Sequence, residues 1–138
     1  MELLRIHHAA IICADYARSR RFYTEVLGLR VVAEHHRAAR QSTKLDLALP
    51  DGSQIELFSF PAPPPRPSRP EAQGLRHLSF AVADVARCKA ELEAQGVAVE
   101  DIRTDEYTGR ASPSSPTRTG CRWSFTKTRP SRAASSRR

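Results

Sequence analysis

The chain has 138 residues, a length that suits one domain or two small modules that share a core. Nothing in it resembles a signal peptide and no apolar run has membrane-spanning length, which argues against a membrane partner. The three cysteines form no CxxC pair, which argues against a disulfide scaffold and favours a reduced, cytoplasmic protein. The net charge of +7 is uneven, because residues 1–107 hold 14 basic and 15 acidic residues and sum to −1, whereas residues 108–138 sum to +8.

Residues 1–60 predict a first module with the element order β-α-β-β-β. Asp15 is a natural N-cap for an amphipathic helix, and Gly28 suits the residue that follows the end of this helix. Apolar and polar residues alternate in four segments of the module, as they do in half-buried strands. The strands are expected at residues 6–13, 29–34, 45–49 and 54–60, the last two joined by a Pro-Asp-Gly turn.

Six prolines make residues 61–74 a linker or a loop without regular structure. A second module follows at residues 75–110 and opens as the first one does. A strand led by His77 precedes a helix that Asp84 caps, and residues 97–102 are expected to form the next strand. In both modules a histidine stands seven residues before the capping aspartate, and such a repeat predicts a duplicated architecture.

The second module is incomplete, because two more strands are due after Tyr107 and the sequence does not supply them. Residues 111–138 are rich in serine, proline and arginine, contain no acidic residue and show no alternation. As written, this basic tail is expected to be disordered, so the regular fold of the second module is expected to stop at about residue 107.

The tail reads differently when it is back-translated in a neighbouring frame. The amino acid nearly fixes the first two bases of most codons. The set of residues that each overlapping codon can encode is therefore limited. The serines permit apolar residues, the threonines permit Asp, and a GAG glutamate codon can arise across Trp123 and Ser124. One solution gives a strand, an Asp-Pro-Asp-Gly turn and a strand, which is the missing hairpin. We hypothesise that the chain is frame-shifted from about Arg110, so that its basic charge is accidental and no nucleic-acid partner is expected.

Two histidines, His8 and His77, occupy equivalent places at the start of the first strand of each module. A polar residue placed twice at the head of an apolar strand suggests a site that the two copies share. His7 is the rival of His8, and the seven-residue spacing to the aspartate favours His8. His35 and His36 fit neither copy and are expected to be solvated.

Four segments carry a resemblance to a known family, and they span both modules. They are His8-x6-Asp15, Phe22-Tyr-Thr-Glu-Val-Leu-Gly-Leu29, Gln54-Ile-Glu-Leu57 and Gly74-Leu-Arg-His-Leu-Ser-Phe80. Together with the paired βαβββ modules, they resemble the vicinal oxygen chelate superfamily, which includes glyoxalase I, extradiol dioxygenases and fosfomycin-resistance proteins. Residues 56–61 with 66–71 look closer still to a small glyoxalase-like bacterial subgroup. The resemblance covers residues 4–107 and implies an α+β fold in which the two modules form a cupped mixed sheet.

The resemblance also implies a metal site, to which each module contributes a histidine from its first strand and a glutamate from its last. In this chain the ligands present are His8, Glu56 and His77. The fourth ligand is the glutamate encoded across Trp123 and Ser124, so the chain as written lacks it. Imidazole and carboxylate ligands suit a divalent ion such as Ni, Zn, Co, Mn or Fe.

The activity implied by the resemblance is that of a glyoxalase-I-like, metal-dependent lyase or isomerase, acting on a small carbonyl or hemithioacetal-type substrate. The metal stabilises an enediolate and a metal-bound glutamate shuttles the proton, a catalytic role for which the chain retains Glu56. Since the principal base of glyoxalase I is the missing glutamate, the chain as written is expected to be impaired. Related proteins are commonly dimers, and we expect a homodimer with a small-molecule substrate.

Two other function classes remain open. An extradiol-type Fe(II) dioxygenase would use the two histidines and the last-strand glutamate without needing Glu56, so the presence of Glu56 argues against it. A metal-free, ligand-sequestering protein of the bleomycin-resistance kind usually lacks the ligand histidines, which argues against that class. Arg37, Arg40 and Lys44 lie where a polar or anionic substrate could be gripped, and a solvated loop is the alternative interpretation.

Overall fold

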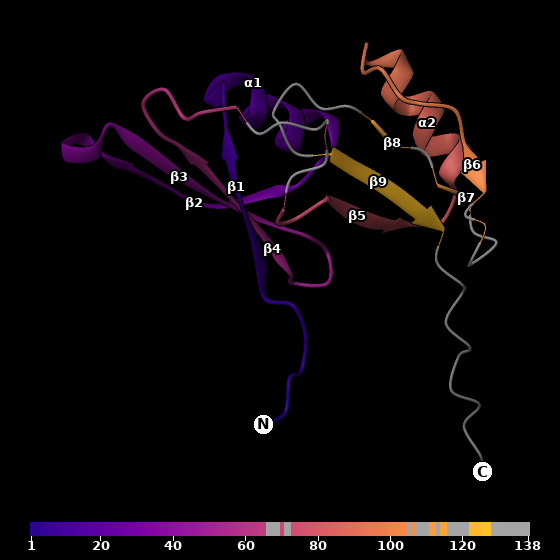
Figure 1. The fold of residues 1–138 in the computed structure, drawn as a ribbon, viewed down its shortest axis with the longest axis horizontal. Coiled ribbons are helices and arrows are strands. Elements are labelled where there is room, and N and C mark those ends of the chain that lie inside the picture. Colours follow the sequence, from indigo (N-terminus) through magenta and orange to yellow (C-terminus); the bar gives the residue numbers. More distant parts are fainter. Residues whose placement is uncertain are drawn as a thin grey trace. The chain divides into compact units, whose positions relative to one another are not determined.

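The computed structural model describes residues 1–65, 70, 73–104, 106, 111–112, 114–115 and 122–127. The chain folds as two compact units, one within Met1–Ala72 and one that starts at Gln73, and each is described by itself. Both units combine helix with a mixed sheet (Figure 1), which confirms the predicted α+β class. Within the described part of the chain, no helix is both long and apolar enough to cross a membrane.

The first unit contains four strands and short helical segments between them. They are β1 (His8–Cys13), α1 (Tyr16–Arg21), the π-helical η1 (Phe22–Val26), β2 (Arg30–Arg37), the 3-10 turn η2 (Ala38–Arg40), β3 (Ser42–Ala48) and β4 (Gln54–Ser59). Asp15 caps α1, because its Oδ1 accepts a hydrogen bond of 3.0 Å from the backbone N–H of Arg18. Gly28 follows the helical segment at φ +71°, as predicted, in a conformation that glycine adopts without strain.

The four strands form one sheet in the order β1-β4-β3-β2. β1 runs parallel to β4, with His8 opposite Gln54 and Ala10 opposite Glu56, whereas the other neighbours are antiparallel. This order places the last strand of the unit beside the first. Consequently Glu56 lies two residues along from His8, on the neighbouring strand and on the same face of the sheet.

Burial alternates along these strands and separates the two faces of the sheet. One face carries the buried side chains of the core: Ile11, Cys13, Leu45, Leu47, Ile55 and Leu57. This face lies toward α1 and η1, where Tyr23 is also buried and where burial raises the pKa of the Cys13 thiol. The opposite face carries the polar side chains, as the alternation in the sequence predicts.

The second unit repeats this plan. Its elements are β5 (His77–Val82), α2 (Val85–Ala94), β6 (Arg103–Thr104), β7 (Ala111–Ser112), β8 (Ser114–Ser115) and β9 (Arg122–Lys127). Asp84 caps α2 as predicted, since it accepts a 3.0 Å hydrogen bond from the backbone N–H of Arg87. β5 runs parallel to β9, β8 is antiparallel to β9, and β6 is antiparallel to β7. The order β5-β9-β8 corresponds to β1-β4-β3 of the first unit, whereas β6 and β7 form a separate two-stranded sheet.

The segment 97–102, expected to form a strand, is irregular, and β6 begins only after it. The backbone N–H of Val97 bonds to the carbonyl of Leu92 at 3.0 Å, which closes the end of α2. Farther along, the ammonium of Lys89 donates to the carbonyl of Glu100 at 3.4 Å. These contacts tie the segment to the helix, and the alternation of residue types in the sequence could not reveal them.

The basic tail, expected to be disordered, contains three strands among its described residues. β9 forms because its backbone pairs with β5, and such a ladder does not require an alternating sequence. Side chains add to it, because Phe125 is buried with its ring 6.1 Å from that of Phe80 and the hydroxyls of Ser79 and Thr126 lie 2.9 Å apart. The rest of the tail lies outside the described residues, and the frame-shift hypothesis stays a prediction.

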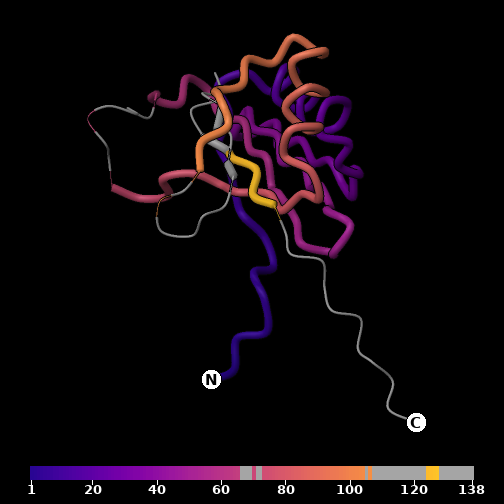
Figure 2. The backbone as a smooth tube through the Cα atoms, turned by 90° about the vertical axis from the view of Figure 1, so that its right-hand side faces the viewer, coloured from indigo at the N-terminus to yellow at the C-terminus, as the bar shows by residue number. Residues whose placement is uncertain are grey.

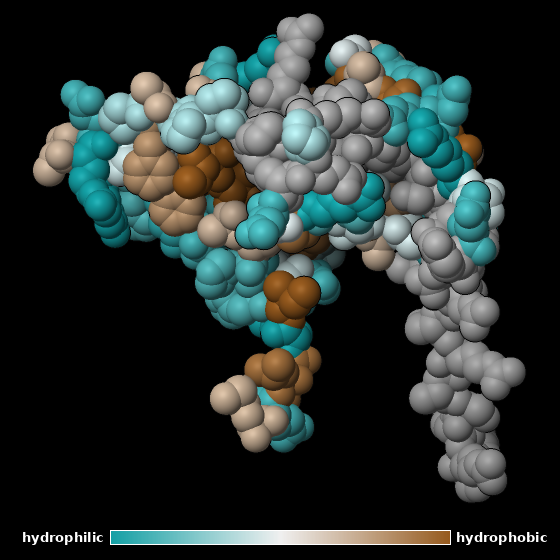
Figure 3. All heavy atoms as spheres, viewed as in Figure 1, coloured by the Kyte–Doolittle hydropathy of each residue, from teal (hydrophilic) through white to brown (hydrophobic). Residues whose placement is uncertain are grey.

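Residues 1–7 precede β1 as an extended arm without regular structure (Figure 2). The arm is tied to the unit near its base, because the guanidinium of Arg5 donates to the main-chain oxygen of Asp51 at 3.0 Å. Apolar side chains gather along the arm in full view of solvent (Figure 3). They are Met1, Leu3, Leu4 and Ile6.

Candidate metal site

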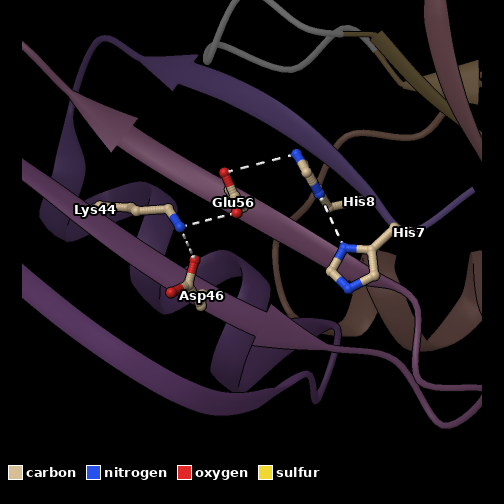
Figure 4. Close-up of polar contacts among 5 residues, drawn as sticks. All are labelled: His7, His8, Lys44, Asp46 and Glu56. Carbon is tan, nitrogen blue, oxygen red and sulfur yellow. Dashed lines mark hydrogen bonds and ion pairs between the residues drawn. The ribbon is translucent and has the colours of Figure 1, made fainter.

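Two of the three candidate ligands lie together on the polar face of the first unit (Figure 4). His8 begins β1 and Glu56 lies in the middle of β4, and the parallel pairing of these strands brings their side chains to one side. The Nε2 atom of His8 lies 3.9 Å from Oε2 of Glu56. The side chain of His8 is 45% exposed and that of Glu56 only 17%, so the carboxylate is largely shielded from solvent and the imidazole is accessible.

Lys44 holds the other oxygen of the same carboxylate. From β3, its ammonium donates to Oε1 of Glu56 at 2.8 Å and pairs with Oδ1 of Asp46 at 2.9 Å. Both carboxylates, with the hydrogen bond to Glu56 as the larger cause, raise the pKa of Lys44 above its ordinary value. The ring of Phe58 lies 5.9 Å from the same nitrogen. Lys44, expected to grip a substrate, is thus already bound to two carboxylates.

Asp46 was missed in the sequence, although a signal for it was present. Asp46 lies directly opposite Glu56 in the antiparallel β3–β4 pair, where two like charges would repel each other. Residues 44, 46 and 56 share the polar face, so a cation was to be expected between the carboxylates. A predicted hairpin in which residue 46 pairs with residue 56 would have revealed this cluster.

His7, the alternative to His8 as a candidate ligand in the sequence, contacts His8 in the structure. The Nδ1 atoms of the two rings lie 3.0 Å apart, and the rings meet edge to face with centroids 5.3 Å apart. The Nδ1 atom of His8 is thereby engaged by His7, and its Nε2 is the atom that faces Glu56. His8 is therefore the histidine that faces Glu56, and the ring of His7 contacts that of His8.

Arg37 and Arg40, the other candidates for substrate binding, lie at the tip of the β2–β3 hairpin and are exposed. Arg37 pairs with Ser42, whereas Asp46, four residues farther along β3, is the partner of Glu56. Four residues of strand correspond to about 13 Å. The structure therefore separates the two arginines from the His8–Glu56 pair, and their role in binding a substrate stays a prediction.

His77, the third candidate ligand, begins β5 in the second unit and is exposed. It lies opposite Arg122 just as His8 lies opposite Gln54, so the two sheets have equivalent registers. In this register the position of Glu56 is taken by Ser124, which is buried. The second unit therefore repeats the histidine and replaces the carboxylate by a hydroxyl.

The donor atoms of the first unit suit a divalent ion. Ligand atoms about 2.0–2.2 Å from a tetrahedral ion lie roughly 3.4 Å apart, so a small rotation would let His8 and Glu56 reach one ion. Among the described residues, no group of three or more His, Cys, Asp or Glu side chains lies close enough to hold a metal ion. The first unit by itself thus offers an incomplete set of ligands, and the role of His8, Glu56 and His77 as ligands stays a prediction.

Comparisons with known proteins identify the family. The sequence matches the model of the glyoxalase/bleomycin resistance protein/dioxygenase superfamily over residues 5–120. It is 52% identical over 110 residues to the uncharacterized protein YwkD of Bacillus subtilis (strain 168), covering 80% of this chain and 86% of YwkD. It is 55% identical over 106 residues to the uncharacterized protein YaeR of Escherichia coli (strain K12), covering 77% and 82%.

A solved structure agrees with these sequence matches. The glyoxalase family protein from Enterococcus faecalis is 38% identical, with a TM-score of 0.82 over 88% of this chain and 96% of that one. The motifs in the sequence and the parallel pairing of the first strand with the last, repeated in both units, indicate the same family. The chain therefore belongs to the glyoxalase/bleomycin resistance protein/dioxygenase superfamily.

Proposed function

We propose that this chain is a glyoxalase-I-like, metal-dependent lyase or isomerase that acts on a small carbonyl or hemithioacetal-type substrate. The observation that carries the proposal is the His8–Glu56 pair, an imidazole and a carboxylate whose nearest atoms are 3.9 Å apart. Both side chains project from paired strands, which hold ligands more firmly than loops do. Imidazole beside carboxylate is a donor set that borderline divalent ions prefer.

Members of this superfamily commonly bind a divalent metal, and we propose His8, Glu56 and His77 as the ligands in this chain. The ion would be Ni, Zn, Co, Mn or Fe, and when bound it supplies a Lewis acid for the substrate carbonyl. The equivalent registers of the two sheets support His77 as the counterpart of His8. Ser124 holds the fourth position, so we expect weaker metal binding than a site with four charged or imidazole ligands would give.

Glu56 is the proposed proton carrier. Its Oε1 is fixed by the ammonium of Lys44 at 2.8 Å, which leaves Oε2 as the oxygen on the side of His8. A carboxylate held in this way can accept a proton from the carbon next to a carbonyl and return it to the neighbouring carbon. Lys44 would then orient the base, with Asp46 balancing its charge.

The two alternative classes fit the described residues less well. A dioxygenase of the extradiol type would not need Glu56, which the pairing of β1 and β4 places beside His8. A metal-free sequestering protein has no need for an imidazole facing a carboxylate, which is what His8 and Glu56 form. Proteins with this fold often form dimers and bind small molecules, and we propose that this chain is a homodimer with a small-molecule substrate.

Metal binding by single-site variants tests the proposal. We expect Zn²⁺, Ni²⁺ or Co²⁺ to raise the melting temperature of the full chain, and His8→Ala, Glu56→Gln and His77→Ala to remove that increase. His35→Ala is the matched control, because His35 is an exposed strand histidine outside the site and should leave the increase intact. A rise in melting temperature that persists in His8→Ala and Glu56→Gln would overturn the proposed site.

A second measurement separates the enzyme from a binding protein. The metal-loaded chain should isomerise a hemithioacetal formed from a small 2-oxoaldehyde and a thiol at a reduced rate, because Ser124 stands where the principal base is expected, and Glu56→Gln should lower kcat further. Tight binding of small ligands by the metal-free chain, without turnover, would favour the sequestering class instead.

A further inference from the structure

The contact between His7 and His8 joins the last residue before β1 to the first residue of that strand. Neighbouring side chains in a strand point to opposite faces, so they do not ordinarily meet. Here the ring nitrogens Nδ1 and Nδ1 lie 3.0 Å apart. The contact is possible because His7 precedes β1 and is not held to the alternation of that strand.

The backbone of His7 is also fixed. Its carbonyl accepts a hydrogen bond of 3.0 Å from the N–H of Gln54, which continues the pairing of β1 with β4 by one residue. The imidazole of His7 therefore starts from a firmly placed main chain, although the residues before it belong to the exposed arm.

The hydrogen bond constrains the tautomer of His8. A neutral imidazole carries one N–H, so only one of the two Nδ1 atoms donates in this bond. If His8 donates from Nδ1, its Nε2 keeps a free lone pair, and this is the atom 3.9 Å from Glu56. The opposite assignment puts the hydrogen of His8 on Nε2, and a protonated Nε2 cannot bind a metal ion beside Glu56.

We propose that His7 is a positioning residue, whose Nδ1 accepts a hydrogen bond from Nδ1 of His8 and holds the His8 ring with an unprotonated Nε2 toward Glu56. This inference rests on the proposed metal site, because it assigns Nε2 of His8 as the ligand atom. Partners that hydrogen-bond the second nitrogen of a ligating histidine typically contribute about 10- to 100-fold in metal affinity.

The experiment compares His7→Ala with His7→Asn in the full chain. The amide oxygen of asparagine can take the place of Nδ1 as an acceptor, whereas alanine cannot. His35→Ala is again the control, since His35 and His36 form the other pair of consecutive histidines in the chain. The readouts are the tautomer of His8 in the metal-free chain, from ¹⁵N NMR of the ring nitrogens, and the affinity for Zn²⁺ from titration.

In the wild-type chain, His7→Asn and His35→Ala, we expect His8 to carry its hydrogen on Nδ1. In His7→Ala we expect the Nε2–H form to become populated and the affinity for Zn²⁺ to fall about 10- to 100-fold. An unchanged tautomer and affinity in His7→Ala would overturn the inference, and so would a loss of Zn²⁺ that His7→Asn fails to restore, because His7 would then be a ligand itself.

The outcome for His8→Ala distinguishes this inference from the proposed function. If His8→Ala loses Zn²⁺ while His7→Ala keeps both tautomer and affinity, the positioning role fails and the metal site stands. If His8→Ala keeps the Zn²⁺ affinity of the wild-type chain, the proposed metal site fails, and the role assigned to His7 fails with it.

Discussion

At the scale of single residues, the polar face is organised by one cation between two carboxylates. Lys44 contacts Glu56 and Asp46, whose side chains are 17% and 14% exposed, so neither carboxylate is well solvated. A half-buried charge that loses its partner keeps its desolvation cost and loses the compensating attraction. The ammonium of Lys44 is therefore more important for stability than a surface ion pair would be.

Lys44→Met tests this directly. We expect the metal-free chain to lose about 1–3 kcal/mol of unfolding free energy, because two facing carboxylates are left without their cation. The stabilisation by Zn²⁺ should increase in the same variant, since the ion can then replace the ammonium. Urea unfolding with and without Zn²⁺ measures both effects, and Arg40→Met serves as the control because Arg40 is exposed. Equal stability of Lys44→Met and the wild-type chain would contradict the cluster.

The pH dependence of this difference follows from the raised pKa of Lys44. The unfolded chain has a pKa near 10.5 at this residue, and the folded chain a higher one. The stabilisation is therefore fully present below the unfolded pKa and is lost as the pH rises through the folded pKa. We expect the gap in unfolding free energy between wild type and Lys44→Met to be constant from pH 7 to 9 and to shrink above pH 10.5. A gap that shrinks already below pH 9 would contradict this assignment.

The sequence identified some residues of the cluster and not others, for a physical reason. His8 and Glu56 stand out because the repeat and the family motifs single them out. Asp46 and His7 act through contacts across strands and along the edge of the sheet, and such contacts depend on register rather than on residue type. The sequence also suggested Lys44 as a substrate ligand, because a lone basic residue does not reveal its partners.

At the scale of elements, strand β9 determines whether the second unit can supply a carboxylate ligand. The alternation of residue types predicted β1, β4 and β5, and it failed for β9, whose pairing depends on the backbone. With β5 and β9 in the register of β1 and β4, Ser124 takes the place of Glu56. At this register position the two units thus differ by one side chain, Glu56 in the first and Ser124 in the second.

Ser124→Glu supplies the missing carboxylate. We expect its affinity for Zn²⁺ to rise at least about tenfold if a fourth charged ligand is gained, which corresponds to about 1.4 kcal/mol. Without metal the variant should be less stable than the wild-type chain, since position 124 is buried and an unpaired carboxylate is costly there. Ser124→Gln has nearly the same shape without the charge, and it should show no gain. Calorimetric titration compares the three chains, and equal affinities would show that position 124 does not face the ion.

The frame-shift hypothesis makes a related prediction at the level of DNA. Sequencing across codons 108–128 should reveal one base inserted or deleted relative to a frame that encodes a strand, an Asp-Pro-Asp-Gly turn and a strand. That frame also encodes a glutamate across Trp123 and Ser124. An unambiguous read in the printed frame would count against a recording error and would leave Ser124 as the residue of the natural chain.

At the scale of the whole molecule, the apolar arm makes association of chains the first property to measure. Four large apolar side chains on residues 1–7 are exposed by 79% or more, which is rarely tolerated in a protein that stays monomeric. We expect sedimentation to give about twice the chain mass of 15.4 kDa. A single-chain mass across the micromolar range would contradict the predicted homodimer.

The clamped ammonium of Lys44 has a chemical consequence. The chain has only three lysines, at positions 44, 89 and 127, and the one at 127 is exposed. Acylating reagents attack the neutral amine, so a lysine held as an ammonium by two carboxylates should react more slowly than Lys127. A metal ion bound to Glu56 would weaken the ion pair between Glu56 and Lys44 and speed the reaction at Lys44. The ratio of modification at the two lysines, read from one mass spectrum, would then report the state of the cluster without any assay of turnover.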